Sequence, residues 1–234
     1  MKSGILLSVM AFFLLAGCSV WRPAGGEAVC DCRREVKVPD RAFRSWLVDN
    51  GYAVKVGGKR LRATPKGCEM TVLECFDKGI HSLEGVALFP QLQEIVCSDN
   101  PVEVLDLNCL RGLRAVYGVN MPLRRLAIDS CHEMRHIELS HTRLDTFTLA
   151  PFPHLDFFFC IFSPLTTLDL APCPALETIY IRGTRIEELD VRPCRELWQI
   201  HALDTPLQRL IVSPEQYRGE IKVSVPDSVN IIVR

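Results

Sequence analysis

Apolar residues recur along this chain with a period of 21 residues, in units that begin at Leu92 and continue without a gap into the unit that begins at Leu197. Unit positions 1, 4, 6, 11, 14 and 16 are the apolar ones. Position 4, for example, holds Ile95, Val116, Ile137, Phe158, Ile179 and Ile200. Residues 70–91 fit the same frame with one extra residue, which makes seven units. Such a repeat predicts a solenoid in which each unit buries its apolar residues against its neighbours.

The spacing within a unit predicts its local structure. Positions 4 and 6 alternate with 3, 5 and 7 at period two, so each unit contributes a short strand. These strands stack in parallel, about 4.8 Å apart. Positions 11, 14 and 16 fill the coil behind the sheet, and residues 188–191 are typical of a second extended segment there. A 21-residue unit leaves little room for helix.

The segment LQEIVCSDNPV (92–102) carries the pattern L-x-x-L-x-C-x-x-N-x-[VI] of a leucine-rich repeat. Over residues 38–212 the chain resembles the 21-residue repeats of exported Bacteroidetes proteins. The resemblance implies an α/β-type leucine-rich-repeat solenoid with a short curved parallel β-sheet and little helix. We expect an N-terminal helical cap over 38–69 with its helix near 39–50, and repeats over 70–217. A C-terminal β cap over 218–234 would hold strands near 220–225 and 229–233.

The N-terminus is typical of an exported chain. Lys2 precedes an apolar run over 5–15, which is too short to span a bilayer as a helix. Leu15-Ala16-Gly17-Cys18 resembles a bacterial lipobox. The resemblance implies a signal peptide over 1–17, lipidation of Cys18 (palmitate among the acyl chains), and a tether over 18–37; the alternative is an ordinary signal peptide. Ser19 stands where an inner-membrane signal would have Asp, so the resemblance favours the outer membrane. Residues 19–23 lack an acidic cluster, which favours its periplasmic side over the cell surface.

Charge and cofactor patterns exclude several functions. Loss of residues 1–17 removes only Lys2, which leaves 26 basic and 28 acidic residues and no support for nucleic-acid binding. Caps of related proteins often carry a calcium-like loop. Here the matching stretch, 50–56, has too few oxygen ligands, so we expect no metal and no cofactor.

Most of the eleven cysteines occupy repeat positions. Position 6 holds Cys75, Cys97 and Cys160, and position 19 holds Cys131, Cys173 and Cys194, with Cys109 one place off that column. Buried thiols are the first interpretation, while an oxidising compartment also allows bridges between same-column neighbours. Cys30, Cys32 and Cys68 lie outside the columns, and a bridge from the 30–32 segment to Cys68 is the first pairing to test.

One motif suggests an enzyme, but the repeat frame contradicts it. Residues 132–136 read His-Glu-Met-Arg-His, which matches the zinc-protease pattern H-E-x-x-H. That chemistry needs a helix, whereas the frame places these residues at the junction from coil into strand. No serine-hydrolase, phosphate-loop or dinucleotide motif is present in the sequence. We therefore expect a binding protein and not an enzyme.

The outward positions of the predicted strands, on the concave face, carry an aromatic patch. Phe157, Phe159 and Ile161 alternate along one unit, and contiguous apolar surface of this kind marks an interface. The candidate partner-binding residues are Tyr117, His136, Phe157, Phe159, Ile161, Phe162, Tyr180, Arg182, Trp198 and His201. The first hypothesis is a membrane-anchored module that binds a protein or a glycan. The second is an envelope lipoprotein that uses the patch to self-associate, for example as a homodimer. A further alternative is that the tether or a loop of the same chain covers the patch.

Overall fold

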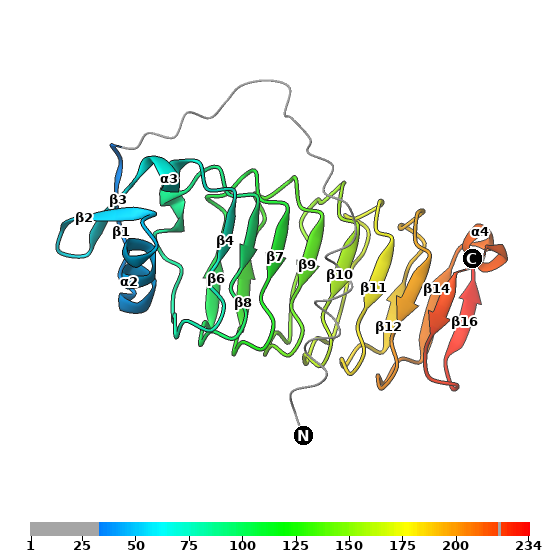
Figure 1. Cartoon of the computed structure of the whole chain (residues 1–234). Helices are drawn as coiled ribbons and strands as arrows, with labels where there is room; N and C mark the ends of the chain where they lie inside the picture. Colours follow the sequence, from blue (N-terminus) through cyan, green and yellow to red (C-terminus); the bar gives the residue numbers. More distant parts are fainter. Residues whose placement is uncertain (1–32, 220) are drawn as a thin grey trace.

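The computed structural model describes residues 33–219 and 221–234, and within them the repeats form the expected solenoid (Figure 1). Eight parallel strands lie side by side in one sheet, in the order β15-β13-β11-β10-β9-β7-β5-β4. From the N-terminal end these are β4 (Val72–Glu74), β5 (Glu94–Val96), β7 (Ala115–Tyr117), β9 (His136–Glu138), β10 (Phe157–Phe159), β11 (Thr178–Tyr180), β13 (Gln199–His201) and β15 (Lys222–Ser224). Pairing joins equivalent unit positions, so Ile95 pairs with Val116 and Val116 with Ile137. The predicted fold and register are confirmed.

A second set of parallel strands forms the back of the coil at unit positions 13–16. One pair comprises β6 (Val104–Asp106) and β8 (Arg125–Ala127), and a second group comprises β12 (Glu188–Asp190), β14 (Arg209–Val212) and β16 (Asn230–Val233). Between the two layers lie the apolar columns that the sequence predicts. Leu105, Leu189 and Leu210 of position 14 are all at most 1% exposed. The core is therefore continuous along the solenoid.

The turn that follows each front strand is built from two special columns. Position 8 adopts a left-handed backbone in every unit, with φ between 51° and 68° at Asp77, Asp99, Asn120, His141, Phe162, Gly183 and Asp204. At position 9 the buried Asn100 accepts hydrogen bonds from the backbone N–H of Lys78 (3.0 Å) and Ile80 (2.9 Å). Its amide donates to the carbonyls of Cys75 (2.8 Å) and Cys97 (2.9 Å). One side chain thus satisfies four backbone groups in the interior of the turn, and three of these hydrogen bonds are buried.

The column cysteines are buried thiols. Six of the seven free cysteines among the described residues are buried, and only Cys109 is exposed. Burial raises the pKa of the Cys160 and Cys173 thiols to about 12, so they act as small apolar residues. Cys68 is disulfide-bonded; the Cys30–Cys32 side of the expected bridge lies outside the described residues, as does Cys18.

A cap covers the N-terminal end of the core. The strands β1 (Glu35–Lys37), β3 (Arg60–Ala63) and β2 (Ala53–Gly57) form an antiparallel sheet. Helix α2 (Arg41–Asp49) begins where the Asp40 carboxylate accepts the N–H of Phe43 at 2.7 Å. Phe43 and Leu47 are fully buried. The helix α3 (Pro65–Cys68) and the 3-10 turn η1 (Val86–Leu88) connect the cap to the first turns. The expected helix near 39–50 is confirmed, and no described helix is long and apolar enough to span a membrane.

The C-terminal segment differs from the expected cap. After α4 (Pro214–Arg218), β15 pairs in parallel with β13, and β16 pairs in parallel with β14. The two expected strands therefore form, but they extend both layers as an eighth turn.

Candidate binding face

The outward surface of the eight-stranded sheet, which we call the sheet face, carries a continuous series of contacting rings. We define the ring ladder as Tyr117, His136, Phe159, Tyr180 and His201. Their ring centroids are separated successively by 4.8, 5.3, 4.8 and 5.3 Å. The last three contacts are edge-on, a favoured geometry for aromatic pairs. The ladder crosses five neighbouring strands, so it is a product of the repeat register.

The ring ladder is packed more tightly than a free surface. Phe157 joins it, with its centroid 5.6 Å from His136 and 6.3 Å from Phe159. His136 and Phe159 are only 7% exposed, whereas Tyr117, Phe157 and Tyr180 are half-buried. His136 and Phe159 are therefore largely covered, and rings from both neighbouring strands pack against each of them.

Burial changes the ionisation of the groups among the rings. It lowers the pKa of His136 to about 4 and, with help from the Arg182 charge, lowers the pKa of His201. Glu138 lies between Tyr117 and Phe159 in the strand register. Burial raises its pKa to about 7, although Ser140 opposes the rise by donating to the carboxylate from its hydroxyl and its N–H. Near neutral pH, His136 is therefore uncharged, whereas the Glu138 carboxyl is close to the midpoint of its titration.

The two ends of the sheet face differ in polarity. On β5, burial and the nearby Glu74 raise the pKa of Glu94. On β7, burial together with Glu94 and Glu138 raises the pKa of Tyr117 to about 12. On β13, the Gln199 amide donates to the Tyr180 hydroxyl at 2.7 Å. These carboxylates and this amide occupy the outward positions 3 and 5 of the repeat, but they are not among the candidate residues named from the sequence.

Phe162 is the exposed edge of this surface and the exception in its column. It is 47% exposed and has φ of 51°, a region that bulky side chains rarely adopt. Its ring centroid lies 5.2 Å from that of His141, and the Arg182 guanidinium lies 5.5 Å above the ring. Arg182 is itself bonded to Asp204 at 2.6 Å. Contacts with His141 and Arg182 on the two neighbouring turns therefore hold the ring at the surface, on a backbone that is strained for phenylalanine.

The remaining candidates lie at the margins of the ring ladder. Ile161 is half-buried beside Phe159, and its N–H donates to the Ser140 hydroxyl at 3.1 Å. Trp198 is 45% exposed, and the Lys222 ammonium lies 5.5 Å from its ring centroid. Trp198 therefore contacts the last turn, where it can border a partner that lies on the ring ladder.

Two other candidate sites have structural explanations. His132 and Glu133 lie in a turn, Met134 is in the core and His136 opens β9, so the helix that a zinc protease requires is not formed there. Among residues 33–219 and 221–234, no cluster of His, Cys, Asp and Glu could hold a metal ion.

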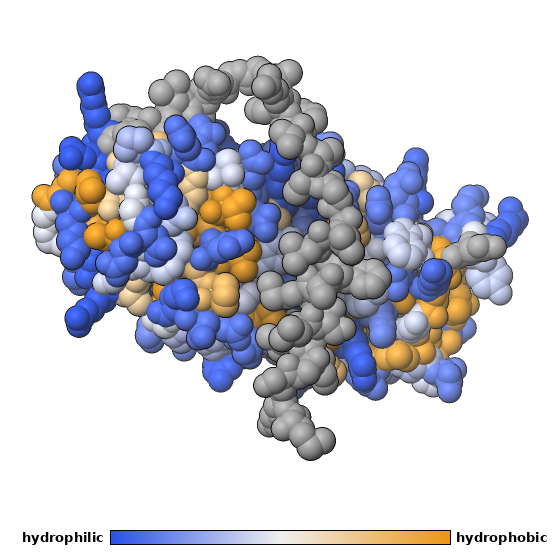
Figure 2. Space-filling model, in the orientation of Figure 1, coloured by the Kyte–Doolittle hydropathy of each residue, from blue (hydrophilic) through white to orange (hydrophobic). Residues whose placement is uncertain are grey.

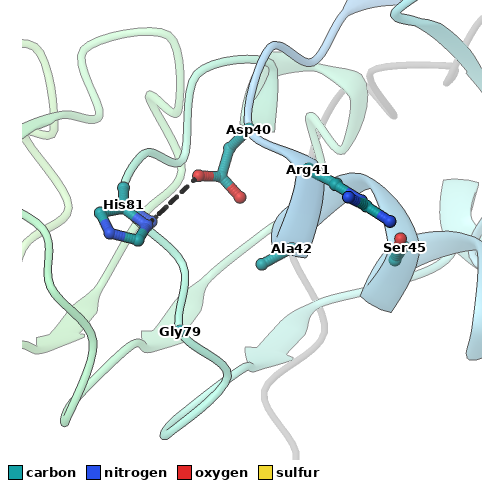
Figure 3. Close-up of a pocket in the computed structure, with 6 residues that line it drawn as sticks. All are labelled: Asp40, Arg41, Ala42, Ser45, Gly79 and His81. Carbon is teal, nitrogen blue, oxygen red and sulfur yellow. Dashed lines mark hydrogen bonds and ion pairs between the residues drawn. The ribbon is translucent and has the colours of Figure 1, made fainter.

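A cavity of about 340 Å³ lies between the cap and the first turn (Figure 3). Its Asp40 carboxylate caps α2, accepts the His81 N–H at 3.0 Å, and lies 4.0 Å from the His81 ring nitrogen Nδ1. These contacts join the cap to the repeats, while Arg41 and Ser45 lie on the far side of Ala42 in Figure 3. The Asp40 carboxylate has a structural role, so this cavity is not the candidate site.

Comparison with solved structures agrees with this architecture. The functional domain of InlJ from Listeria monocytogenes, described as including a cysteine ladder, is 21% identical with a TM-score of 0.56 over 63% of this chain and 32% of that one. A leucine-rich-repeat protein of Leptospira interrogans is 14% identical with a TM-score of 0.57 over 72% and 43%. This chain has the leucine-rich-repeat fold.

Internalin C2 of Listeria monocytogenes shares the leucine-rich-repeat fold over 84% of this chain and 94% of its own length, at 13% identity and a TM-score of 0.52. The chain spans less than half the length of the first two structures. No protein-family profile matches the sequence, and a search of curated proteins found no match. These likenesses establish the fold alone, and the function rests on the sheet face.

Proposed function

We propose that this protein is a lipid-anchored leucine-rich-repeat module of a bacterial envelope that binds a partner protein through the ring ladder and Phe162. The observation that carries the proposal is the unbroken contact of five rings across five strands. Packed aromatic residues flanked by an arginine are the composition of an interface hot spot. Rings that are fixed before binding lose little conformational entropy when a partner arrives.

The strain at Phe162 supports the same site. Its column otherwise holds Asp, Asn, Gly and His, residues that adopt a left-handed backbone more easily. A half-exposed phenylalanine at such a position costs folding free energy, and sites of this kind cluster in binding regions. Phe162 and the half-buried Tyr180 would supply the apolar contact area, with Arg182 and His201 at its border.

The binding experiment compares purified variants as baits for envelope extracts. A protein enriched by the wild type should be lost with Tyr180→Ala and with Phe162→Asn. The matched control is Tyr217→Ala, which removes a tyrosine that is 63% exposed on α4, away from the ring ladder. Equal recovery with all variants would refute the proposed face. If no protein is captured and a self-associated species disappears with Phe159→Asp, the self-association alternative replaces this proposal.

The anchor is a separate part of the proposal and rests on the motif Leu15-Ala16-Gly17-Cys18. Metabolic labelling with a palmitate analogue should mark the wild-type protein, and Cys18→Ala should abolish the label. Fractionation should place the wild type in the outer membrane, and protease treatment of intact cells should leave it uncut if it faces the periplasm. A soluble, unlabelled wild type would refute the anchor without affecting the proposed binding face.

A further inference from the structure

The C-terminal end of the solenoid exposes residues that belong to the core. Val223 pairs with Ile200 in the position-4 column, and Ile231 pairs with Leu210 in the position-14 column. Ile200 and Leu210 are fully buried, whereas Val223 and Ile231 are 37% and 42% exposed. Val233 pairs with Val212 and is 42% exposed against 4%. Figure 2 shows apolar surface gathered over this end.

The apolar residues at this end are neither covered by a cap nor replaced by polar residues. At the other end of the stack, Phe43 and Leu47 of the cap helix are fully buried over the first turn. A terminal repeat of a soluble solenoid normally carries a polar outer side. Here the inward positions are all apolar: Ile221, Val223, Val225, Val229, Ile231 and Val233. The strands β15 and β16, which carry or adjoin these residues, are also edge strands of their sheets.

We propose that a second copy of this chain covers this end through a two-fold axis that runs from the front sheet to the back strands. Such an axis places β15 antiparallel to β15 of the other copy and β16 antiparallel to β16. Both open edges are then paired by one symmetry operation, as in an isologous dimer interface. Antiparallel edge pairing also satisfies the outer backbone groups of both strands.

The pleat of the strands makes this arrangement self-complementary. Opposed residues in an antiparallel pair point to the same side, so inward residues must face inward residues. A register centred on Val223 opposes Ile221 with Val225, and one centred on Ile231 opposes Val229 with Val233. All six apolar residues of each copy then meet apolar partners across the axis.

Charges do not oppose this pairing. In the same registers Lys222 faces Ser224, and Arg234 faces Ser228. Lysine on an edge strand often protects against pairing. The Lys222 ammonium, however, lies 5.5 Å from the Trp198 ring centroid on the preceding turn, so it leaves the edge accessible.

The first experiment measures the mass of the full chain by native mass spectrometry from mild detergent. The wild type should appear at twice the mass of its own single mature chain, and Val223→Lys and Ile231→Lys should each weaken dimerisation at least about tenfold. Val104→Lys is the control, because Val104 is 46% exposed on β6, far from this end. A single-chain mass for the wild type, or an equal loss with Val104→Lys, would overturn the proposal.

A second experiment locates the interface independently of stability. Ile231→Cys places one thiol of each copy at the two-fold axis, near the separation that a disulfide requires. A covalent dimer should form on a non-reducing gel, above any wild-type background and absent with Val104→Cys. Dimerisation should persist with Phe162→Asn, which changes the exposed edge of the sheet face. A dimer that Phe162→Asn abolishes, or failure of Ile231→Cys to cross-link, would refute the proposed arrangement.

Discussion

Phe162 and Gly183 form a pair whose coupling can be worked out from their geometry. Gly183 has φ of 68°, and a Cβ built on it would lie 2.4 Å and 2.7 Å from the Cδ1 and Cε1 atoms of the Phe162 ring. No side chain fits at that separation, so Gly183→Ala must displace the ring. The ring can move because it is 47% exposed, but it then loses its contacts with Arg182 and His141.

The expected cost of Gly183→Ala has two parts. A left-handed backbone at alanine costs about 1–2 kcal/mol, and the lost ring contacts cost about 1 kcal/mol. The free energy of unfolding should therefore fall by about 2–3 kcal/mol. Phe162→Asn exchanges the ring for a residue that tolerates this backbone, as Asn120 does at φ of 55°. In the Phe162→Asn background, Gly183→Ala should cost only about 1–2 kcal/mol, which leaves a coupling of about 1 kcal/mol.

Urea unfolding of the wild type, both single variants and the double variant measures this coupling as a double-mutant cycle. Gly112→Ala is the control, because a Cβ at Gly112 has no atom within 4 Å and its φ is not left-handed; it should change the unfolding free energy little. Costs that add to within about 0.3 kcal/mol would refute the packing argument. Phe162→Asn alone should change stability by less than about 1 kcal/mol while it abolishes partner capture.

Three further predictions follow from buried groups. Asn100→Ala should lower the free energy of unfolding by about 2–4 kcal/mol in the same urea assay, because it leaves four backbone groups without their partner, three of them in buried hydrogen bonds. Among the seven free cysteines of the described chain, a thiol reagent should label Cys109 before unfolding and the other six only on unfolding; label that peptide mapping locates on any of those six in the folded protein would contradict this. Burial raises the pKa of Glu138 from 4.5 to about 7, so the protonated form favours folding and stability falls as the pH rises through this range. Relative to wild type, Glu138→Gln should therefore gain roughly 3 kcal/mol between pH 4.5 and 7, and a constant difference would show that Glu138 titrates normally.

The repeat made the strand register predictable before the structure. Pairing of Ile95 with Val116 follows from a 21-residue period, since every apolar column must stay on one side of the sheet. All five residues of the ring ladder were among the candidates named from the sequence, because the outward positions are known once the register is known. It could not indicate that His136 and Phe159 are buried, since that depends on how rings from several strands pack together.

The eighth turn was missed for a different reason. Residues 218–234 have lost the leucine spacing of the earlier units, and their two apolar triplets resemble any pair of short strands. Only the pairing of β15 with β13 and of β16 with β14 shows that they continue the stack. The left-handed φ of Phe162 was also beyond the sequence, because phenylalanine carries no local signal for that backbone.

A solenoid supplies its own internal comparison, since each residue has equivalents in the other turns of the same chain. Most columns are uniform, as stability by stacking requires. Two exceptions lie in the C-terminal half: a bulky ring in the left-handed column at Phe162, and core-column residues exposed at Val223 and Ile231. Neither is explained by the stability of the repeat, because an Asn or a polar residue would suit each position better. A property that costs stability in one turn and is absent from its equivalents is most simply explained by contact with another molecule.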